Sequence, residues 1–141
     1  MDPIINYGAV FVAAMVSMVV GGLWFSPVLF GKTWMKLSGI TPKKIAEAKK
    51  KGMNGMALSY FGQFIASLVT AYVLAHFVDY ANATTFVLGL QTGFWVWLGF
   101  VAPIMLGMVL WEGKPMQLYI LNVGHYLVCL LLMGGILAAW A

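Results

Sequence analysis

Charged residues are scarce in this sequence. Only 9% of its 141 residues are charged, four of them are acidic, and none is arginine. Soluble domains carry about 25% charged residues, which help to supply the polar surface over their apolar core. With 62% hydrophobic residues, this chain has too few polar side chains for a soluble fold. The composition therefore excludes an ordinary soluble enzyme and indicates a lipid environment.

Cysteine and clustered metal ligands are also scarce. Cys129 is the single cysteine, so no disulfide can form within the chain, and a lone apolar cysteine is usually a small packing residue. The two histidines, His76 and His125, fall at different depths of their apolar segments and do not suit a shared haem. We find no spacing typical of a metal cluster, a nucleotide loop or a nucleophile–base pair. We therefore expect no metal and no cofactor.

Long uncharged runs make up most of the chain. Each exceeds the roughly 20 residues that an α-helix needs to cross the hydrocarbon layer. The runs are Pro3–Gly31, Gly52–Val78, Tyr80–Trp111 and Pro115–Ala141. A transmembrane barrel would require alternating strands of about ten residues, and these runs do not alternate. The first run is also longer than the apolar core of a cleaved signal peptide, which is about 7–15 residues.

We predict an all-α integral membrane four-helix bundle that forms a single domain over residues 1–141. The helices are expected at about 4–25, 54–77, 84–111 and 116–140. A cytoplasmic loop over residues 28–53 separates the first two helices. Within it, "TPKKIAEAKKKG" predicts a short amphipathic helix, because Thr41 is a good N-cap and Gly52 suits the stop.

The lysines predict the orientation. Seven of the eight lysines lie between the first two runs, and the only charged residue between the second and third runs is Asp79. Cytoplasmic loops attract Lys and Arg, so we expect the lysine-rich loop and the turn at Glu112 and Lys114 to face the cytoplasm, with both termini outside. No nucleic-acid partner is expected, because base-stacking aromatics in a soluble module are lacking.

The short lysine-rich helix is expected to lie along the inner membrane surface. Ammonium groups there would contact anionic lipid headgroups. The lysines concerned are Lys43, Lys44, Lys49, Lys50 and Lys51. The alternative is that this segment forms a binding arm for a soluble partner.

Aromatic residues concentrate where the first apolar run ends, in "WFSPVLFGKTW". Indole rings prefer the headgroup zone, where both their apolar body and their N–H are satisfied. The expected interface anchors are Trp24, Trp34 and Trp111 at the inner boundary and Trp140 at the outer one. Pro27 has no backbone N–H and disfavours helix at the preceding residue, so it should end or kink the first helix there.

The same stretch and the later "LWEGKPMQLYILNVGHYLVCLLLMGGILAAW" resemble DUF1761, a family of small bacterial and archaeal four-helix membrane proteins of unknown function. The residues that carry the resemblance are Trp24, Ser26, Pro27, Phe30, Gly31 and Trp34, then Glu112, Gly113 and Lys114, then Asn122 and Gly124. His125 stands where a tyrosine would be expected. The resemblance implies a multi-pass protein of the prokaryotic cytoplasmic membrane and brings no activity with it.

Small residues recur at helical spacing and predict close helix packing. Association in lipid depends on close packing and buried polar contacts. Residues of this kind are Ala13, Ser17 and Gly21 in the first helix and Gly89 and Gly93 in the third. They are expected to pack within the bundle. Because four helices leave little room for a cavity, we also expect a homo-oligomer, for which one ridge would form the seam.

Polar side chains inside the apolar runs are the candidate ligand-binding residues. They are Gln63, Gln91, Asn122 and His125. Asn122 and His125 are three residues apart and share a helix face. Polar groups at membrane depth face protein or water rather than lipid. The simplest role for these four residues is hydrogen bonding between helices. The functional alternative is that they line a polar pocket.

Two functional hypotheses follow. The first is a module that binds or transports a small uncharged or amphipathic molecule, or an ion, through a polar intramembrane pocket. The second is a structural or accessory subunit that packs against lipid or a partner membrane protein. A membrane enzyme is disfavoured because no catalytic constellation is visible. A proton-coupled antiporter is disfavoured because Glu47 and Glu112 both fall outside the apolar runs.

Overall fold

The computed structural model describes residues 5–50 and 53–140, apart from the side chains of residues 42, 45, 48, 49 and 53–56. The helices are α1 (Tyr7–Trp24), α2 (Gly31–Ser38), α3 (Pro42–Lys50), α4 (Met53–Tyr80), α5 (Phe86–Phe100), α6 (Ala102–Met105), α7 (Gly107–Leu110) and α8 (Met116–Ala139). No strand occurs in this described part of the chain. Within the described residues, four segments are long and apolar enough to cross a membrane, namely Tyr7–Trp24, Ala57–Tyr80, Phe86–Leu110 and Met116–Ala139. The predicted all-α class with four apolar helices is confirmed.

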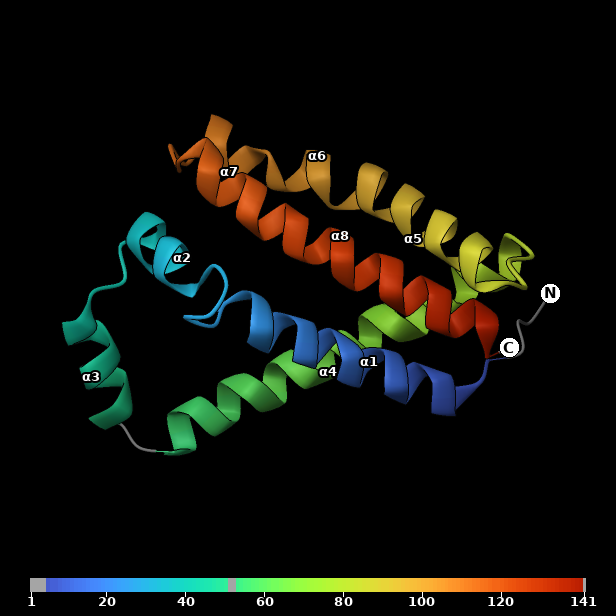
Figure 1. The fold of residues 1–141 in the computed structure, drawn as a ribbon, viewed down its shortest axis with the longest axis horizontal. Coiled ribbons are helices and arrows are strands. Elements are labelled where there is room, and N and C mark those ends of the chain that lie inside the picture. Colours follow the sequence, from blue (N-terminus) through green and yellow to red (C-terminus); the bar gives the residue numbers. More distant parts are fainter. Residues whose placement is uncertain (1–4, 51–52, 141) are drawn as a thin grey trace.

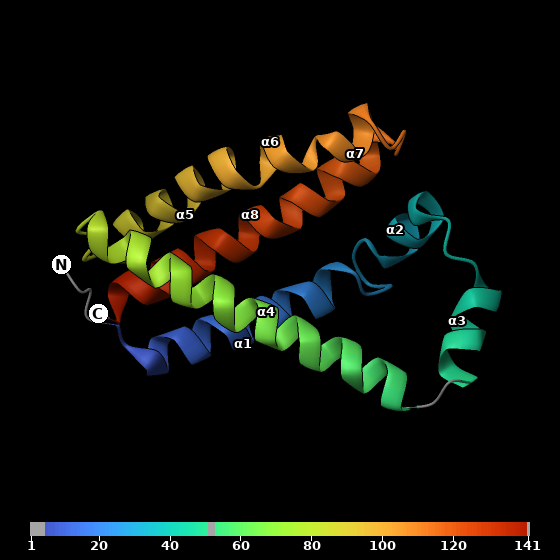
Figure 2. The same cartoon turned by 180° about the vertical axis from the view of Figure 1, so that it is seen from behind.

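The start of α1 and the end of α8 lie at one end of the bundle (Figure 1). The connection between α4 and α5 lies at that end too, whereas α2, α3 and the turn between α7 and α8 lie at the other. Seen from behind, α4 crosses α1 and diverges from α8 toward the end that carries α3 (Figure 2). We call the end with α2 and α3 the lysine end and the opposite one the terminal end.

The core forms where α8 meets α1, α4 and α5. Ala9 and Ala13 of α1 and Ala71 of α4 are fully buried, and Leu74 and Met133 are the largest side chains with almost no exposure. Small residues on α1 and α4 let the two backbones approach each other. The core therefore occupies the terminal half of the bundle, while the lysine end is more open.

The packing of α5 against α8 depends on glycine. A Cβ atom on Gly89 would collide with the backbone of Gly134, and one on Gly93 would collide with the backbone of Leu130. On α8, a Cβ on Gly134 would in turn collide with the Gly89 carbonyl, and one on Gly135 with the Phe86 ring. These glycines permit backbone contact between helices, which is how small residues act in membrane bundles.

The third apolar segment is interrupted rather than continuous. The sequence predicts one helix over about 84–111, but the structure divides this stretch into α5, α6 and α7. Pro103 stands near the start of α6. It has no N–H for the Gly99 carbonyl, and its ring crowds that carbonyl, which explains a break at this point. Beyond it, Gly113 adopts a left-handed φ of 68° in the turn that leads to α8.

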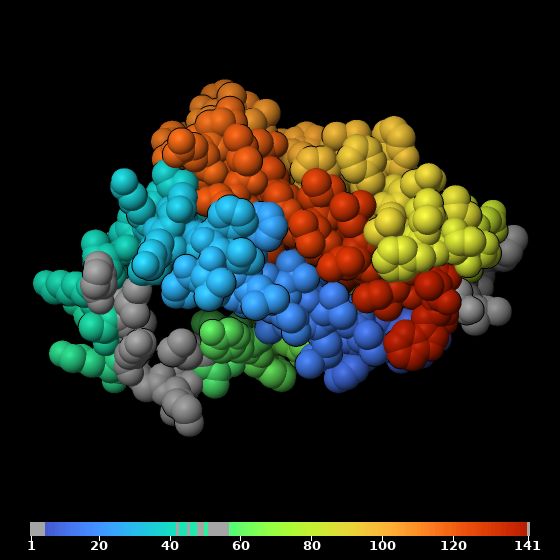
Figure 3. Space-filling model, viewed as in Figure 1, coloured from blue at the N-terminus to red at the C-terminus, as the bar shows by residue number. Residues whose placement is uncertain are grey.

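The loop after α1 holds two short helices instead of one. The sequence predicts a helix starting near Thr41, and α3 occupies that place, but α2 is not expected from the pattern. Gly39 ends α2 with a left-handed φ of 73°. A Cβ on Gly31 would collide with the Phe25 and Ser26 carbonyls, so the turn after Trp24 requires glycine. In the space-filling view α2 lies beyond the end of α1 and reaches α8 (Figure 3).

The four predicted tryptophan anchors take different positions. Trp111, which is 88% exposed, and Trp140, which is half exposed, project from the protein. Trp24 is half-buried and its Nε1 donates a hydrogen bond to the Leu121 carbonyl at 3.1 Å. Trp34 packs against Phe25 with ring centroids 5.1 Å apart. The first two have the exposure that an interface anchor needs, and Trp24 instead ties α1 to α8.

At the terminal end, Asn6 joins the first and last helices. Its Oδ1 accepts a hydrogen bond from the Ala9 N–H at 3.1 Å and so caps α1. Its Nδ2 donates to the Trp140 carbonyl at 2.8 Å. One amide side chain therefore satisfies a free donor of α1 and an acceptor at the end of α8.

Replacing Asn6 should separate these two contributions. Asn6→Ala removes both hydrogen bonds and is expected to lower the free energy of unfolding by about 1–2 kcal/mol. Asn6→Asp keeps the cap and loses only the donor to Trp140, so it should cost less than alanine. Thermal unfolding of the purified chain in detergent measures both, and equal stabilities for the wild type and the alanine variant would contradict the role.

Candidate functional site

A cavity lies among the four apolar segments, in the half of the bundle nearer the lysine end. Its volume is about 750 Å³, within the range of about 300–1,000 Å³ that is usual for small-molecule sites. Its walls come from the second half of α1, the middle of α4, the α5–α6 break, and α8. The sequence-based expectation of little room for a cavity within one chain therefore does not hold.

The wall from α4 is polar. Gln63, Ser67 and Thr70 are four and three residues apart and therefore share one helix face. Ser67 is buried and its hydroxyl lies 3.9 Å from the Met18 sulfur of α1. Thr70 donates to the Ala66 carbonyl of its own helix at 2.9 Å. Gln63 is exposed, so its amide can donate to and accept from a ligand in the cavity.

The wall from α8 carries His125, Cys129 and Met133 on successive turns of one face. His125 and Cys129 are buried, and the His125 Nε2 lies 3.4 Å from the Cys129 Sγ. The thiol also lies 3.9 Å from the Ser17 carbonyl of α1. The imidazole nitrogen of His125 and the thiol sulfur of Cys129 therefore lie next to each other at the cavity wall.

Gly21 determines how closely α1 approaches His125. A Cβ on Gly21 would lie 3.2 Å from the His125 Nε2, which is tight for a carbon–nitrogen contact. The imidazole is further enclosed by aromatic rings, with centroid separations of 5.0 Å to Phe25 and 6.2 Å to Trp24. The end of α1 thus holds the imidazole against the cavity.

The remaining wall is apolar. It consists of Val96 and Phe100 of α5, Val101 at the break, and Met105 of α6. Because Pro103 interrupts the helix here, Phe100 and Met105 belong to different helical segments but line the same space. The cavity therefore has a polar side on α4 and an apolar side on α5 and α6.

The structure brings together two of the four candidate ligand-binding residues. Gln63 and His125 line the cavity, whereas Asn122 is half-buried on α8 and does not. Gln91 lines a separate groove of about 380 Å³ with Thr92 and Trp95. Asn122 lies about one helical turn before His125, which is the first residue of α8 to line the cavity.

Cys129 and Met133 are cavity residues that the sequence reasoning assigned no role. Cys129 was expected only to pack, and no pairing with a histidine was predicted. The signal was nevertheless present, since His125, Cys129 and Met133 recur at intervals of four, which places side chains on one helix face.

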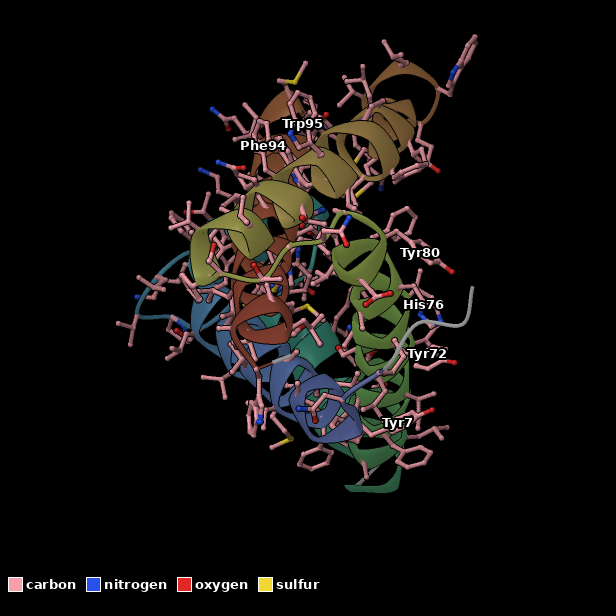
Figure 4. The ribbon with its side chains drawn as sticks, turned by 90° about the vertical axis from the view of Figure 1, so that its right-hand side faces the viewer. Tyr7, Tyr72, His76, Tyr80, Phe94 and Trp95 are labelled. Carbon is pink, nitrogen blue, oxygen red and sulfur yellow. The ribbon has the colours of Figure 1, made fainter. Side chains whose placement is uncertain are left out.

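A row of aromatic side chains near the terminal end lies outside the cavity. Tyr7, Tyr72, His76 and Tyr80 follow one another along the surface (Figure 4). The His76 Nδ1 donates to the Tyr72 carbonyl at 2.8 Å, and its ring centroid is 4.7 Å from that of Tyr72. This row has the amphipathic character of a membrane-interface belt.

Comparison with known proteins identifies one family. The family model described as "Protein of unknown function (DUF1761)" matches residues 8–138. The match covers all four apolar segments, except for one residue at each outer end, and the loop between the first two. No curated protein and no solved structure gives a significant match.

Proposed function

We propose a function from the geometry of this chain alone. The chain belongs to the DUF1761 family of proteins of unknown function, so the family assigns it no activity. The chain is a multi-pass membrane protein with four apolar helices. Our proposal is that its cavity binds a small uncharged or amphipathic molecule within the membrane. The observation that carries the proposal is one cavity with a polar wall on α4 facing an apolar wall on α5 and α6.

The chemistry of the lining favours an uncharged ligand. No Asp, Glu or Lys is among the described residues that line the cavity. A fully charged group at membrane depth is costly unless it finds a partner of opposite charge. The polar end of a ligand would therefore be a hydroxyl, carbonyl or amide group, bound by Gln63 and Ser67. Its apolar part would lie against Phe100 and Met105.

Native mass spectrometry of the purified protein tests this proposal. The wild type should carry a co-purified small molecule. Gln63→Leu/Ser67→Ala should lower its occupancy by about 10- to 100-fold, since each lost hydrogen bond to a neutral group is worth about 0.5–1.5 kcal/mol.

The matched control is Gln117→Leu, because Gln117 is an exposed glutamine of α8 outside the cavity. It should leave occupancy unchanged. Unaltered occupancy in the Gln63→Leu/Ser67→Ala variant, or a wild type that carries no ligand and is not stabilised by any uncharged amphipathic compound, would contradict the proposal.

A structural or accessory role is the second candidate. It is favoured by α3, which projects from the bundle at the lysine end (Figure 1) with exposed Lys43, Lys44 and Lys50. The side chain of Lys49 and the whole of Lys51 lie outside the described residues. Lysines near an anionic surface contribute about 1 kcal/mol each, so we propose contact with anionic headgroups.

We further propose that the lysine end faces the cytoplasm of a prokaryotic cell and both termini face outward. The support is the bias of lysine toward that end, together with the start of α1 and the end of α8, which both lie at the opposite end (Figure 1). A periplasm-dependent reporter fused after Trp140 should be active, and the same reporter fused after Gly39 should be inactive. The reverse pattern would overturn this orientation.

We also propose that copies of this chain associate into a homo-oligomer. The glycines that could form a seam between copies, Gly89 and Gly93, are already occupied by α8 of the same chain. A homo-oligomer would therefore use other surfaces, and the mass measured under native conditions in lipid nanodiscs gives the number of chains.

A further inference from the structure

Soft metal-ligating side chains gather at the α8 wall of the cavity. His125, Cys129 and Met133 are 8%, 3% and 1% exposed, respectively. Met18 of α1 and Met105 of α6 line the same cavity. We propose that this wall binds a soft monovalent metal cation, Cu(I), through His125 and Cys129 with a methionine thioether as a further ligand.

The separation of the two nearest donor atoms fits one shared ion. Metal–imidazole and metal–thiolate bonds of about 2.0 and 2.3 Å at a tetrahedral angle place the two ligand atoms about 3.5 Å apart. The His125 Nε2 and the Cys129 Sγ are 3.4 Å apart. Both atoms can therefore coordinate one ion without movement of the helix backbone.

The types of donor select the metal. Thiolate and thioether ligands favour Cu(I), whereas a structural zinc site uses four ligands drawn from cysteine, histidine and carboxylate. The described residues contain no group of three or more His, Cys, Asp or Glu side chains able to hold a metal. Methionine supplies the missing donors, because its flexible side chain can move its sulfur onto an ion.

Charge favours the same metal. Binding converts Cu(I) and the Cys129 thiol into a neutral Cu(I)–thiolate and releases one proton to water, with no change of oxidation state. A neutral product suits a cavity wall at membrane depth, where net charge is costly. A divalent ion on the same thiolate would keep a positive charge, and no carboxylate lines the cavity to balance it.

This inference goes beyond the proposed function and does not depend on it. The ion uses the α8 wall, whereas the uncharged molecule uses Gln63 and Ser67 on α4. Failure of Cu(I) binding with normal ligand occupancy would overturn only the metal site. Loss of ligand occupancy with unchanged Cu(I) binding would affect only the proposed binding of the uncharged molecule at the α4 wall.

Competition with a chromophoric Cu(I) chelator tests the metal site. The full chain is purified in detergent under anaerobic, reducing conditions and titrated with Cu(I). One ion should bind per chain. Cys129→Ala should weaken binding by about 100-fold or more, and His125→Ala and Met133→Leu each by about tenfold or more.

Met116→Leu is the matched control, because Met116 is an exposed methionine at the start of α8 and outside the cavity; it should bind as the wild type does. Ag(I), an air-stable soft cation, should protect Cys129 of the wild-type protein from alkylation, a readout that does not depend on variants that fold poorly. Absence of Cu(I) binding, equal binding by Cys129→Ala/His125→Ala, or absence of Ag(I) protection would overturn the proposal.

Discussion

Replacing Gly93 by alanine is expected to lower the free energy of unfolding by about 3 kcal/mol or more, at the upper end of overpacking effects. The added methyl group would meet the backbone of Leu130 rather than a flexible side chain. The α5 and α8 backbones would have to separate, and the neighbouring contact between Gly89 and Gly134 would loosen with them. Thermal or denaturant-induced unfolding of the purified chain measures the loss.

Gly99→Ala is the matched control on the same helix. A Cβ at Gly99 meets nothing within 4 Å. Alanine there should leave stability unchanged or raise it by about 0.4–1 kcal/mol, because it restricts the unfolded chain. Equal stabilities of the Gly93→Ala and Gly99→Ala variants would show that close backbone contact does not hold α5 against α8.

Filling the cavity next to His125 is expected to slow the alkylation of Cys129 by about tenfold or more, because thiol reactivity depends on access. The chain has a single cysteine, so an uncharged maleimide reports on the α8 wall alone. Gly21→Leu places a side chain where α1 faces the His125 Nε2. Gly21→Ala should give a smaller decrease, since its Cβ alone needs a shift of only a few tenths of an ångström.

Gly62→Leu provides the control for this experiment. Gly62 is an exposed glycine of α4, outside the cavity, whose Cβ would meet nothing within 4 Å. In the Gly62→Leu variant, Cys129 should be alkylated at the wild-type rate. A wild-type rate in the Gly21→Leu variant as well would mean that the space between α1 and α8 does not control access to the thiol.

The four apolar helices and the charged loop could be predicted because the composition along the chain is enough to indicate them. Uncharged runs and the lysines between them are enough to predict four apolar helices and a charged loop. Local breaks were harder to predict. Pro103 stands inside an apolar run, where proline gives only a weak boundary signal, so the division into α5, α6 and α7 emerged only from the structure.

The candidate site was predicted less well, because it depends on which helix faces meet. Gln63 and His125 are far apart in the sequence, and only the placement of α4 and α8 around one cavity brings them together. Asn122 shares a face with His125 in a simple helical projection, yet it falls outside the lining. Cys129 was undervalued because a lone cysteine is usually a packing residue, although its spacing from His125 already indicated a pair.

The hydrogen bond from Asn6 to the Trp140 carbonyl has a consequence for chain connectivity. The 2.8 Å contact places both extremities of the bundle side by side, so a short peptide could join them into a ring. Cutting that ring between α2 and α3 would yield a circular permutant with the same helix neighbours in a new sequence order. Such permutation is tolerated where termini are close and the new ends are exposed.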